Sequence, residues 1–448
     1  MSTSENAPAE APVTVIEPLS NPLRGTVRVP GDKSISHRAV LFSAMAEGTS
    51  HLAGVLDSAD VRSSIGAVRA LGAKVALEKQ PDGSLAGSVE GWGERGPAQP
   101  ADPIDCGNSG TTVRLLMGVL APWDVEVGLT GDSSLRRRPM RRIADPLKLM
   151  GASFTPEGVK TLPLTIAGTR SLHALDYDSP VASAQLKTAI LLAGIFASGT
   201  TSVHEPAPSR NHTELMLPGF GVNVEAAPGE ASVVGGQKIV ACDVDVPGDP
   251  SSAAFAACAA AIMPESSVRI ENVSLNPARI GFVRVLERMG ADVSTTPTGT
   301  TGEEPCGTVS VAYTPHLHSC EVEGREIASL VDEVPVLALV AAHAEGETVF
   351  HEVGELRVKE TDRLAAIIDG LALLGVRAWA DGDDLHIEGK PGFTAPEGVL
   401  FDSLGDHRLA MTWSLVGFTG RTPVRVRDFE AVRVSYPNFR ADIERLAE

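Results

Sequence analysis

The chain has 448 residues, of which 43% are hydrophobic and 21% are charged, as is typical of a packed globular protein. Its 57 acidic residues outnumber its 38 lysines and arginines and give a formal net charge of -19. This charge excludes a general affinity for nucleic acid or for anionic membranes, because the overall field repels polyanions. A single core rarely serves more than about 250 to 300 residues, so we expect two domains.

The N-terminal residues 1–13 contain acidic residues and prolines but no lysine or arginine, which predicts a disordered tail and fits neither a secretory signal nor a transit peptide. The five cysteines form no C-x-x-C pair, which favours reduced thiols in the cytosol over a zinc site or a disulfide framework. Every uncharged apolar run stops short of about 18 residues. We therefore expect a cytoplasmic protein with neither a membrane span nor a bound metal.

One pattern recurs along the chain: an amphipathic helix, a glycine and a short strand. Each glycine is expected to close its helix with a positive φ, and the residues after it are expected to enter a sheet. The interval between these glycines is about 70 to 85 residues. A sixth helix over residues 439–448 begins on the same schedule, so six units favour two domains of three units each. The glycines are Gly72, Gly151, Gly221, Gly290 and Gly375.

A second similarity marks the boundary between the halves. Residues 29–34 read VPGDKS and residues 246–251 read VPGDPS, and each segment opens an alanine-rich apolar helix. One half therefore runs from about residue 31 to 245 and the other from about 246 to 448. On this pattern alone, the strand before residue 31 is free to join either half.

The first segment that carries chemistry, residues 30–40, reads PGDKSISHRAV. A helix that begins near Ser34 presents free backbone N–H groups and the positive end of its dipole to an anion. Lys33 would stand at the mouth of such a site, and Ser34 and Arg38 share a helix face because they are four residues apart. The pattern favours a phosphate site that is not of the Walker type. A solvated helix start is the alternative.

Two further segments combine small residues with arginines. Residues 105–114 read DCGNSGTTVR, and their small side chains would let a phosphate approach the backbone amides; an ordinary capped helix start fits them equally well. Residues 132–142 place five arginines within seven positions. In an acidic protein this favours one or two ligand arginines, with Arg138 beside Pro139 as the first candidate, over a nucleic-acid patch.

Residues 357–363 place an acidic residue between two basic residues. Glu360 follows Lys359, and Arg363 would lie one helical turn from that lysine. This pattern favours a ligand site that can also transfer a proton. A charged helix start with internal ion pairs is the alternative.

Two more segments place polar groups at the start of apolar helices. His407 and Arg408 precede one such run, where the histidine could equally be structural, and Asp332 enters another. A buried acid of this kind often has a raised pKa suited to proton transfer. Together, the segments predict a cleft between the halves that gathers two anionic small molecules and moves protons between them. They contain no metal, flavin or dinucleotide motif.

Eight segments, in order from about residue 14 to the C-terminus, resemble the signature segments of the 5-enolpyruvylshikimate-3-phosphate synthase family, and specifically its divergent bacterial branch. The resemblance implies an α/β (α+β) fold, the enolpyruvyl transferase fold, with two domains of three repeated βαβαββ-like units around a pseudo-threefold axis. The segments read PGDKSISHRAV, CGNSGTTVRLL, SLRRRPM, SAQLKTAILLAG, PGDPSSAAF, VDEVPVLAL, LRVKETDRL and DHRLAM.

The resemblance also implies a domain division and a reaction. Residues 31–245 would form the domain that mainly binds shikimate 3-phosphate, residues 14–30 would join residues 246–448, and the active site would lie in the cleft between the domains. The enzyme would transfer the enolpyruvyl group of phosphoenolpyruvate to the 5-hydroxyl of shikimate 3-phosphate and release phosphate, on the shikimate pathway to chorismate and aromatic amino acids. No cofactor is implied, and we expect a monomer whose partners are these two small molecules.

Position by position, the resemblance assigns residues to catalysis and to two substrate sites. Asp332 would orient or deprotonate the 5-hydroxyl, Glu360 would exchange the proton at C3, and Lys359 would assist both; Lys33 would also be catalytic. The shikimate 3-phosphate residues would be Lys33, Ser34, Arg38, Ser183, Ala184, Gln185, Ser209, Arg210, Asp332 and Lys359. The phosphoenolpyruvate residues would be Lys33, Asn108, Gly110, Arg138, Gln185, Arg363, His407 and Arg408.

Two positions depart from the family pattern. Val434 stands where many members have Lys, so a phosphoenolpyruvate contact is missing or supplied by Arg433, and Leu115 stands where many have Pro. The family is the target of glyphosate, and tolerant members often carry Ala at the position of Gly110. Gly110 leaves room for the inhibitor while Leu115 and Val434 point the other way, so we expect at least partial sensitivity.

Two alternatives compete with this function. The related enzyme that uses UDP-N-acetylglucosamine would carry a Cys in the loop over residues 133–139 and an Asn after Lys33, and this chain has neither. A noncatalytic protein that binds phosphorylated metabolites would be expected to lack Asp332, Lys359 or Glu360, and all three are present.

Overall fold

The computed structural model describes residues 11–448, so most of the tail expected over residues 1–13 lies outside the described residues. Val13, the last residue of that expected tail, already belongs to strand β1 (Val13–Ile16). This strand pairs antiparallel with β23 (Val424–Arg427). Hydrogen bonds to the far end of the chain therefore hold Val13 in a sheet.

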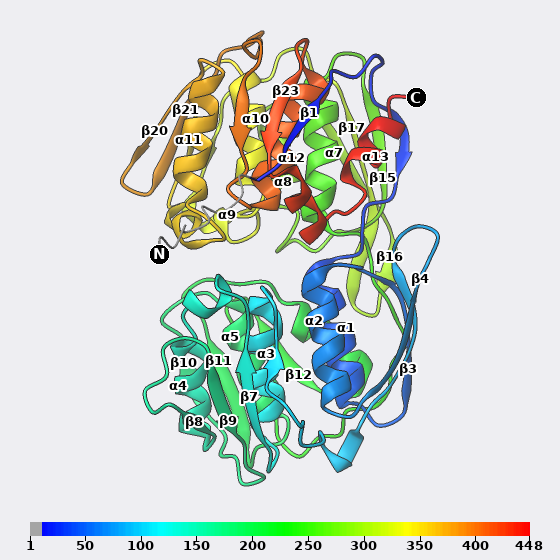
Figure 1. The fold of residues 1–448 in the computed structure, drawn as a ribbon, viewed down its shortest axis with the longest axis vertical. Coiled ribbons are helices and arrows are strands. Elements are labelled where there is room, and N and C mark those ends of the chain that lie inside the picture. The colour runs from blue at the N-terminus through cyan, green and yellow to red at the C-terminus, as the bar shows by residue number, and fades with distance from the viewer. Residues whose placement is uncertain (1–10) are drawn as a thin grey trace, which may run out of the picture.

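The chain forms two bodies, and each has its own hydrophobic core (Figure 1). One core contains buried side chains between residues 35 and 246. The other combines buried side chains of residues 16–29 with those of residues 253–447. We propose that the bodies are the two domains expected from the sequence: the first domain is residues 31–245, and the second is residues 14–30 with 246–448.

Each unit of the repeat builds one small sheet with two helices. A complete unit runs strand, helix, strand, helix and hairpin; its first two strands are parallel and the other neighbours antiparallel. This is a βαβ crossover followed by a hairpin. The unit in the middle of the first domain contains β6 (Ile104–Asp105), α3 (Gly110–Leu120), β7 (Glu126–Thr130), α4 (Arg141–Met150), β8 (Ser153–Thr155) and β9 (Leu164–Ala167).

The other two units of the first domain follow the same plan. One is continuous in sequence, and the other takes its first strand, β14, from the end of the domain. The continuous unit contains β10 (Asp176–Asp178), α5 (Ala184–Gly194), β11 (Thr200–His204), α6 (His212–Met216), η3 (Leu217–Phe220), β12 (Val224–Ala227) and β13 (Glu230–Val234). The other contains β14 (Val244–Asp245), α1 (Lys33–Met45), β3 (Thr49–Val55), α2 (Ala59–Ala70), β4 (Lys74–Lys79) and β5 (Leu85–Glu90).

The second domain repeats the plan with strands supplied by the start of the chain. Strand β2 opens its first unit, and β1 stands in the three-stranded sheet of its last unit. The first unit contains β2 (Arg24–Val27), α7 (Pro250–Ile262), β15 (Ser267–Ser274), α8 (Gly281–Arg288), β16 (Asp292–Thr301) and β17 (Glu304–Ala312). The second contains β18 (Glu321–Val322), α9 (Gly324–Ile327), α10 (Val334–His343), β19 (Glu347–Phe350), α11 (Arg363–Leu373), β20 (Arg377–Asp381) and β21 (Asp384–Glu388). The last contains β22 (Leu400–Asp402), α12 (His407–Thr419), β23 and α13 (Phe439–Arg445).

The glycines predicted to end the helices behave as expected. All five have a positive φ, between 67° and 117°, which residues with a Cβ rarely adopt. A strand follows each of them, and the predicted sixth helix is α13. The sixfold repeat is therefore confirmed, and with it the α/β class and the two-domain fold.

Two segments of chain cross between the domains and touch each other there. Gly31 and Gly248 form an antiparallel bridge. The buried guanidinium of Arg279 binds Asp32 at 2.5 Å and Asp249 at 2.9 Å. These two carboxylates are the N-caps of α1 and α7, so one side chain ties together the first helices of both domains.

Three helices form the centre of each domain. In the first domain α3 contacts α1 and α5, and in the second α7, α10 and α12 contact one another. Close packing is possible at Gly118 of α3, where an added Cβ would lie 2.4 Å from the Ala189 carbonyl oxygen of α5. The central helices of each domain are therefore held against one another by close packing.

Two sequence expectations concern membranes and cysteines. Within residues 11–448, no helix is both long and apolar enough to cross a bilayer. The five cysteines are all free thiols, and three of them are buried. They agree with the reduced, mostly structural thiols expected from the sequence.

Replacing Gly118 by Ala should lower the stability of the first domain by about 1–3 kcal/mol, because the new methyl group overpacks a closed helix interface. Gly66, exposed on α2 with no atom within 4 Å of an added Cβ, is the matched control. Gly66→Ala should raise stability by about 0.5–1 kcal/mol, since Ala is the better helix former. Thermal unfolding measures both changes, and equal melting temperatures for the two variants would contradict the packing argument.

Candidate active site

The residues singled out in the sequence lie at or just before the N-terminal ends of buried helices from both domains. In the first domain, Lys33 opens α1, Gly110 opens α3 and Ala184 opens α5. In the second, Asp332 comes shortly before α10 and His407 opens α12. Free N–H groups and the positive ends of helix dipoles therefore gather where the two domains meet, which favours anions.

Asp332 is a point of contact between the two domains. Arg210 Nη2 of the first domain lies 2.5 Å from Asp332 Oδ2, and Arg363 Nη1 of the second donates to Oδ1 at 3.1 Å. Lys359 Nζ and Arg408 Nη2 lie 3.8 Å and 3.7 Å from the carboxylate oxygens. Four cations from both domains thus surround one acid.

These cations shift the pKa of Asp332 in the direction opposite to the one expected from the sequence. Burial by itself raises the pKa of this carboxyl, but the charges of Arg408, Lys359, Arg210 and Arg363 outweigh burial and hold the pKa well below its usual range. The expectation of a raised pKa is wrong here, because the segment around Asp332 does not reveal that four cations converge on it. Asp332 is an ionised carboxylate that can accept a proton.

Arg363 connects Asp332 to two further carboxylates. Its Nε donates to Asp406 Oδ2 at 2.7 Å and its Nη2 to Glu360 Oε2 at 2.7 Å. Burial raises the pKa of Glu360, but the neighbouring groups, of which Arg363 has the largest effect, together lower it more, so Glu360 is ionised as well. Lys33 also lowers the pKa of Glu360, which means that the start of α1 lies close to the second domain here.

Lys359 reaches Asp332 by a different route from the one expected. The sequence suggests a helix with Lys359 and Arg363 one turn apart, whereas α11 begins only at Arg363. Lys359 follows the short 3-10 helix η4 (Gly354–Val358). Its Nζ lies 2.6 Å from Glu355 Oε1, and the loop conformation carries the ammonium toward Asp332.

The start of α1 supplies one accessible cation and one buried cation. The Lys33 side chain is 21% exposed, and its Nζ lies 3.3 Å from Asp60. Arg38 is buried, and Arg38 Nη1 donates to the Ser34 carbonyl oxygen at 3.0 Å, as their shared helix face suggests. The other donors of Arg38 are Nε, to Thr213 Oγ1 at 2.8 Å, and Nη2, to Thr188 Oγ1 at 2.8 Å.

The glycine-rich turn and the arginine-rich loop meet at Gly110. Arg138 Nη2 donates to Asn108 Oδ1 at 2.6 Å, and a Cβ on Gly110 would lie 3.4 Å from Arg138 Nη1 and 3.2 Å from Arg114 Nη1. Arg114 was not singled out from the sequence, yet it donates to Gln185 Oε1 at 2.7 Å. Burial and, to a smaller extent, the charges of Arg142 and Arg138 lower the pKa of Arg114 to about 9. Its signal in the sequence is a lone charge within an apolar helix.

Ser183 and Ser209, predicted for the same substrate, share one partner. Glu205 accepts from the Ser183 backbone N–H at 2.8 Å and from Ser209 Oγ at 2.8 Å. Sequence reasoning missed Glu205, because nothing in the segment HEPAPSR distinguishes it from a surface acid. Its carboxylate fixes both serines relative to α5.

His407 is buried at the start of α12. Burial lowers the pKa of His407 well below its usual range, and the charges of Arg408 and Lys33 act in the same direction. The imidazole is therefore neutral. Its Nε2 is buried and has no hydrogen-bond partner among the described residues; a binding role for His407 stays a prediction.

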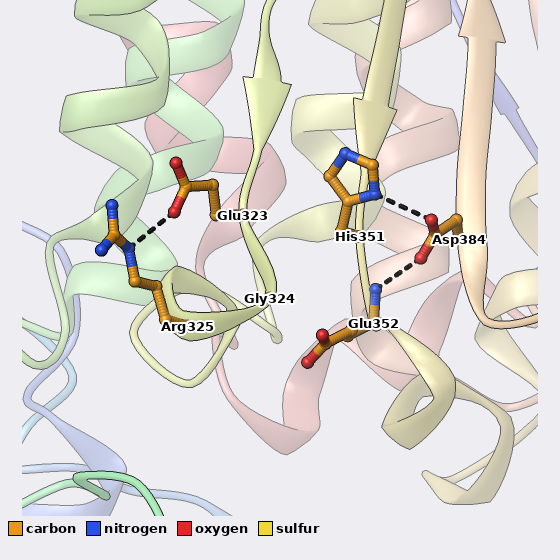
Figure 2. A pocket seen from close by; sticks show the side chains of 6 residues that line it. All are labelled: Glu323, Gly324, Arg325, His351, Glu352 and Asp384. Atoms are coloured by element: carbon orange, nitrogen blue, oxygen red, sulfur yellow. Dashed lines mark hydrogen bonds and ion pairs between the residues drawn. The ribbon is translucent and has the colours of Figure 1, made fainter.

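A pocket on the second domain provides a contrast (Figure 2). Figure 2 shows His351 Nδ1 directed at Asp384, 2.7 Å away, and Glu323 paired with Arg325 at 2.6 Å. Three carboxylates against one arginine would repel a polyanion. The cation-rich surroundings of Asp332 are therefore the better candidate for a site that binds anions. The pocket is lined by Glu323, Gly324, Arg325, His351, Glu352 and Asp384.

Comparison with known proteins identifies the family. Residues 19–443 match the family model of EPSP synthase (3-phosphoshikimate 1-carboxyvinyltransferase). The chain belongs to the EPSP synthase family. A relative from Bacillus thuringiensis subsp. konkukian, named 3-phosphoshikimate 1-carboxyvinyltransferase, is 44% identical over 435 residues, which cover 97% of this chain and 99% of the relative. A relative of the same name from Brevibacillus brevis is 44% identical over 419 residues, or 93% of this chain and 96% of the relative.

Solved structures agree with this family and with the fold. The EPSP synthase from Acinetobacter baumannii is 39% identical and superposes with a TM-score of 0.87 over 97% of this chain and 98% of that chain. The enolpyruvyl transferase NikO from Streptomyces tendae superposes with a TM-score of 0.75 over 98% of both chains at 19% identity. The likeness to NikO, at 19% identity, supports the fold alone. The likeness to the Acinetobacter baumannii enzyme, at 39% identity, also agrees with the EPSP synthase family.

His37 lies on α1, the helix whose start is predicted to bind an anion. It should make the folded protein less stable as the pH falls. Burial, opposed by the charge of Asp60 and reinforced by those of Lys33 and Arg38, lowers the pKa of His37 to about 3. The unfolded histidine takes up a proton near pH 6.5, so stability is lost as the pH falls below about 6.5, by about 1.4 kcal/mol per pH unit. His37→Gln should flatten this slope in thermal unfolding measured between pH 7 and pH 5.

His51, whose side chain is 70% exposed, provides the matched control. His51→Gln should leave the pH dependence of the melting temperature close to that of the unaltered chain, because its ion pair with Asp243 lies at the surface and such exposed pairs contribute little to stability. A slope for His37→Gln that is as steep as that of the control would contradict the assignment.

Proposed function

We propose that this enzyme transfers the enolpyruvyl group of phosphoenolpyruvate to the 5-hydroxyl of shikimate 3-phosphate and releases phosphate. The observation that carries the proposal is an ionised acid, Asp332, held at the domain boundary by Arg210 of one domain and Arg363 of the other. A reaction that joins two anions needs cations on both sides and a base between them. Membership of the EPSP synthase family supports the same reaction.

We assign the two substrates to the two groups of residues named above. Shikimate 3-phosphate would be held mainly by the first domain, at the starts of α1 and α5 and by the loop of Ser209 and Arg210. Phosphoenolpyruvate would lie between the start of α3, with Asn108, Gly110 and Arg138, and the second domain. Because each anion then contacts cations from both domains, substrate binding favours closure of the cleft.

In the addition step, the 5-hydroxyl oxygen forms a bond to C2 of phosphoenolpyruvate and the hydroxyl proton passes to Asp332. C3 gains a proton and becomes a methyl group, so a positioned acid must supply that proton. Glu360 is ionised beside Arg363, and the negative charges that the substrates bring raise its pKa and favour its protonation. Lys359, next to Asp332, would assist both transfers.

In the elimination step, the bond from C2 to the phosphate oxygen breaks and phosphate leaves. The C3 methyl group loses a proton to Glu360, which restores the double bond, and the proton held by Asp332 is free to return to the leaving phosphate. Fixed cations stabilise the charge that develops on the leaving group. Lys33 and the guanidinium of Arg408 are the groups that we assign to this role.

We further propose that the enzyme acts as a monomer in the cytoplasm. The monomer is supported by the contact of Asp332 with Arg210, since both sides of the site come from one chain. The reducing compartment is supported by the five free cysteines.

The reaction is tested by phosphate release from phosphoenolpyruvate, with shikimate 3-phosphate or UDP-N-acetylglucosamine as acceptor. Release is expected with shikimate 3-phosphate alone. Asp332→Ala should lower kcat by about 10²- to 10⁴-fold, because it removes the base, and Lys33→Met should raise the KM of both substrates. Asp243→Ala, at an exposed acid paired with His51, is the control. Release with the other acceptor, or with neither, would refute the proposal.

Glyphosate should inhibit the enzyme by occupying the phosphoenolpyruvate site, and Gly110→Ala should weaken this inhibition. The new Cβ would lie 3.2 Å and 3.4 Å from guanidinium nitrogens of Arg114 and Arg138, which must shift by a few tenths of an ångström. The longer inhibitor should lose more affinity than phosphoenolpyruvate, so its inhibition constant should rise by a larger factor than the KM of phosphoenolpyruvate. Steady-state kinetics measure both factors, and equal factors would count against a shared site.

Leu115 and Val434 are the two positions that depart from the family pattern. Leu115 is fully buried in α3, so it influences the glycine only through the helix. Val434 ends the 3-10 helix η5 (Phe429–Val434). Arg433, the cation suggested as a substitute there, pairs with Glu430 at 2.6 Å and is 72% exposed, which favours a missing contact over a replaced one.

A further inference from the structure

A group of buried charges lies behind the start of α5. Lys187, on that helix, is 3% exposed, and its Nζ lies 2.8 Å from Glu205 Oε2 and 2.7 Å from Glu214 Oε1. The two carboxylates are 0% and 5% exposed. Buried ion pairs lose much of their attraction to desolvation and seldom stabilise a fold more than apolar side chains of the same shape. Stability alone therefore gives little reason for three charges in the interior.

The contacts of Glu205 suggest a role in ligand binding. One of its oxygens accepts from the Ser183 backbone N–H and the other from Ser209 Oγ, both at 2.8 Å. Ser183 is the N-cap of α5, and Ser209 stands in the loop before α6. One buried carboxylate thus fixes two segments that come together at the proposed shikimate 3-phosphate site.

Arg38 completes the charge balance of this group. Its Nε donates to Thr213 Oγ1, the neighbour of Glu214. Burial, opposed by the charge of the nearby Glu214, lowers the pKa of Arg38 to about 10. Two cations, Lys187 and Arg38, therefore offset two carboxylates, Glu205 and Glu214, behind the serines.

We propose that Lys187 is a positioning residue for the phosphate group of shikimate 3-phosphate. The inference rests on the proposed function, since it takes Ser183 and Ser209 as ligands of that substrate. Lys187 neutralises Glu205, so the carboxylate can hold both serines without repelling the incoming phosphate. Lys187 does not touch the phosphate itself. Without it, Arg38 alone would offset the two buried carboxylates, and one uncompensated negative charge would oppose the dianion.

The test is the kinetics of Lys187→Met, a side chain of similar length without the charge. The KM of shikimate 3-phosphate should rise at least about tenfold, the KM of phosphoenolpyruvate less than about twofold, and kcat should stay within about threefold, because only one substrate faces the uncovered carboxylates. A merely structural lysine would alter the two KM values in parallel. Parallel changes, or no change, would overturn the proposal.

A second variant, Lys187→Met with Glu205→Gln, removes both members of the ion pair. The glutamine oxygen can still accept one hydrogen bond, so the KM of shikimate 3-phosphate should return to within about threefold of the unaltered enzyme. This variant keeps the proposal testable where Lys187→Met alone does not fold. If the lysine contacted the phosphate directly, the double variant would still show a loss of at least about tenfold, and that result would overturn the positioning role.

Two comparisons complete the experiment. Lys238→Met breaks a Lys–Glu pair of similar length, 2.7 Å, whose side chains are 67% and 68% exposed, and should leave both KM values unchanged. Failure of the unaltered enzyme to release phosphate would refute the proposed function. An active enzyme with parallel KM changes in Lys187→Met would refute only the role of Lys187.

Discussion

The arrangement of the two domains depends on the buried guanidinium of Arg279. It binds Asp32 and Asp249, which cap the first helices of the two domains where the connecting segments cross. Each carboxylate also accepts a hydrogen bond from the backbone of the helix that it caps. Removing one partner from such a buried set typically costs about 3–5 kcal/mol. The helix start that carries Lys33 is therefore fixed relative to the second domain by a charge network rather than by apolar packing.

The same principle organises the candidate active site. Cations that must receive two anions repel one another, and fixed carboxylates hold them in place until the substrates arrive. Asp332 gathers four cations, and Arg363 is itself held by Asp406 and Glu360. This arrangement lowers the pKa of Asp332, so the group that holds the cations is also an ionised base. Positioning and proton transfer thus rely on one set of contacts.

Much of the fold and part of the site could be predicted from local sequence. The glycines that close the helices stand out because only glycine adopts a positive φ without strain, and cations at helix starts stand out in an acidic chain. Lys187 and Glu205 could not be found in this way, because their partners, although in the same unit of the repeat, are brought together only when the loop after β11 folds against α5. Arg114 is a lone charge in an apolar helix, but its partner Gln185 lies in another unit. The direction of the pKa shift of Asp332 was predicted wrongly for a related reason. Burial of this acid follows from the local pattern, whereas the four cations around it come from other segments of the chain.

The sequence by itself determined the repeat, the number of domains, the helix starts that can bind an anion and the family to which the chain belongs. These features depend on residue types and on spacings along the chain. The tertiary structure alone decided which strands the units exchange, which cations meet at Asp332 and which carboxylate holds Ser183 and Ser209. Those contacts join residues of different helices, strands and loops, most of them far apart in sequence, and their energies depend on distance and burial, which exist only once the chain has folded.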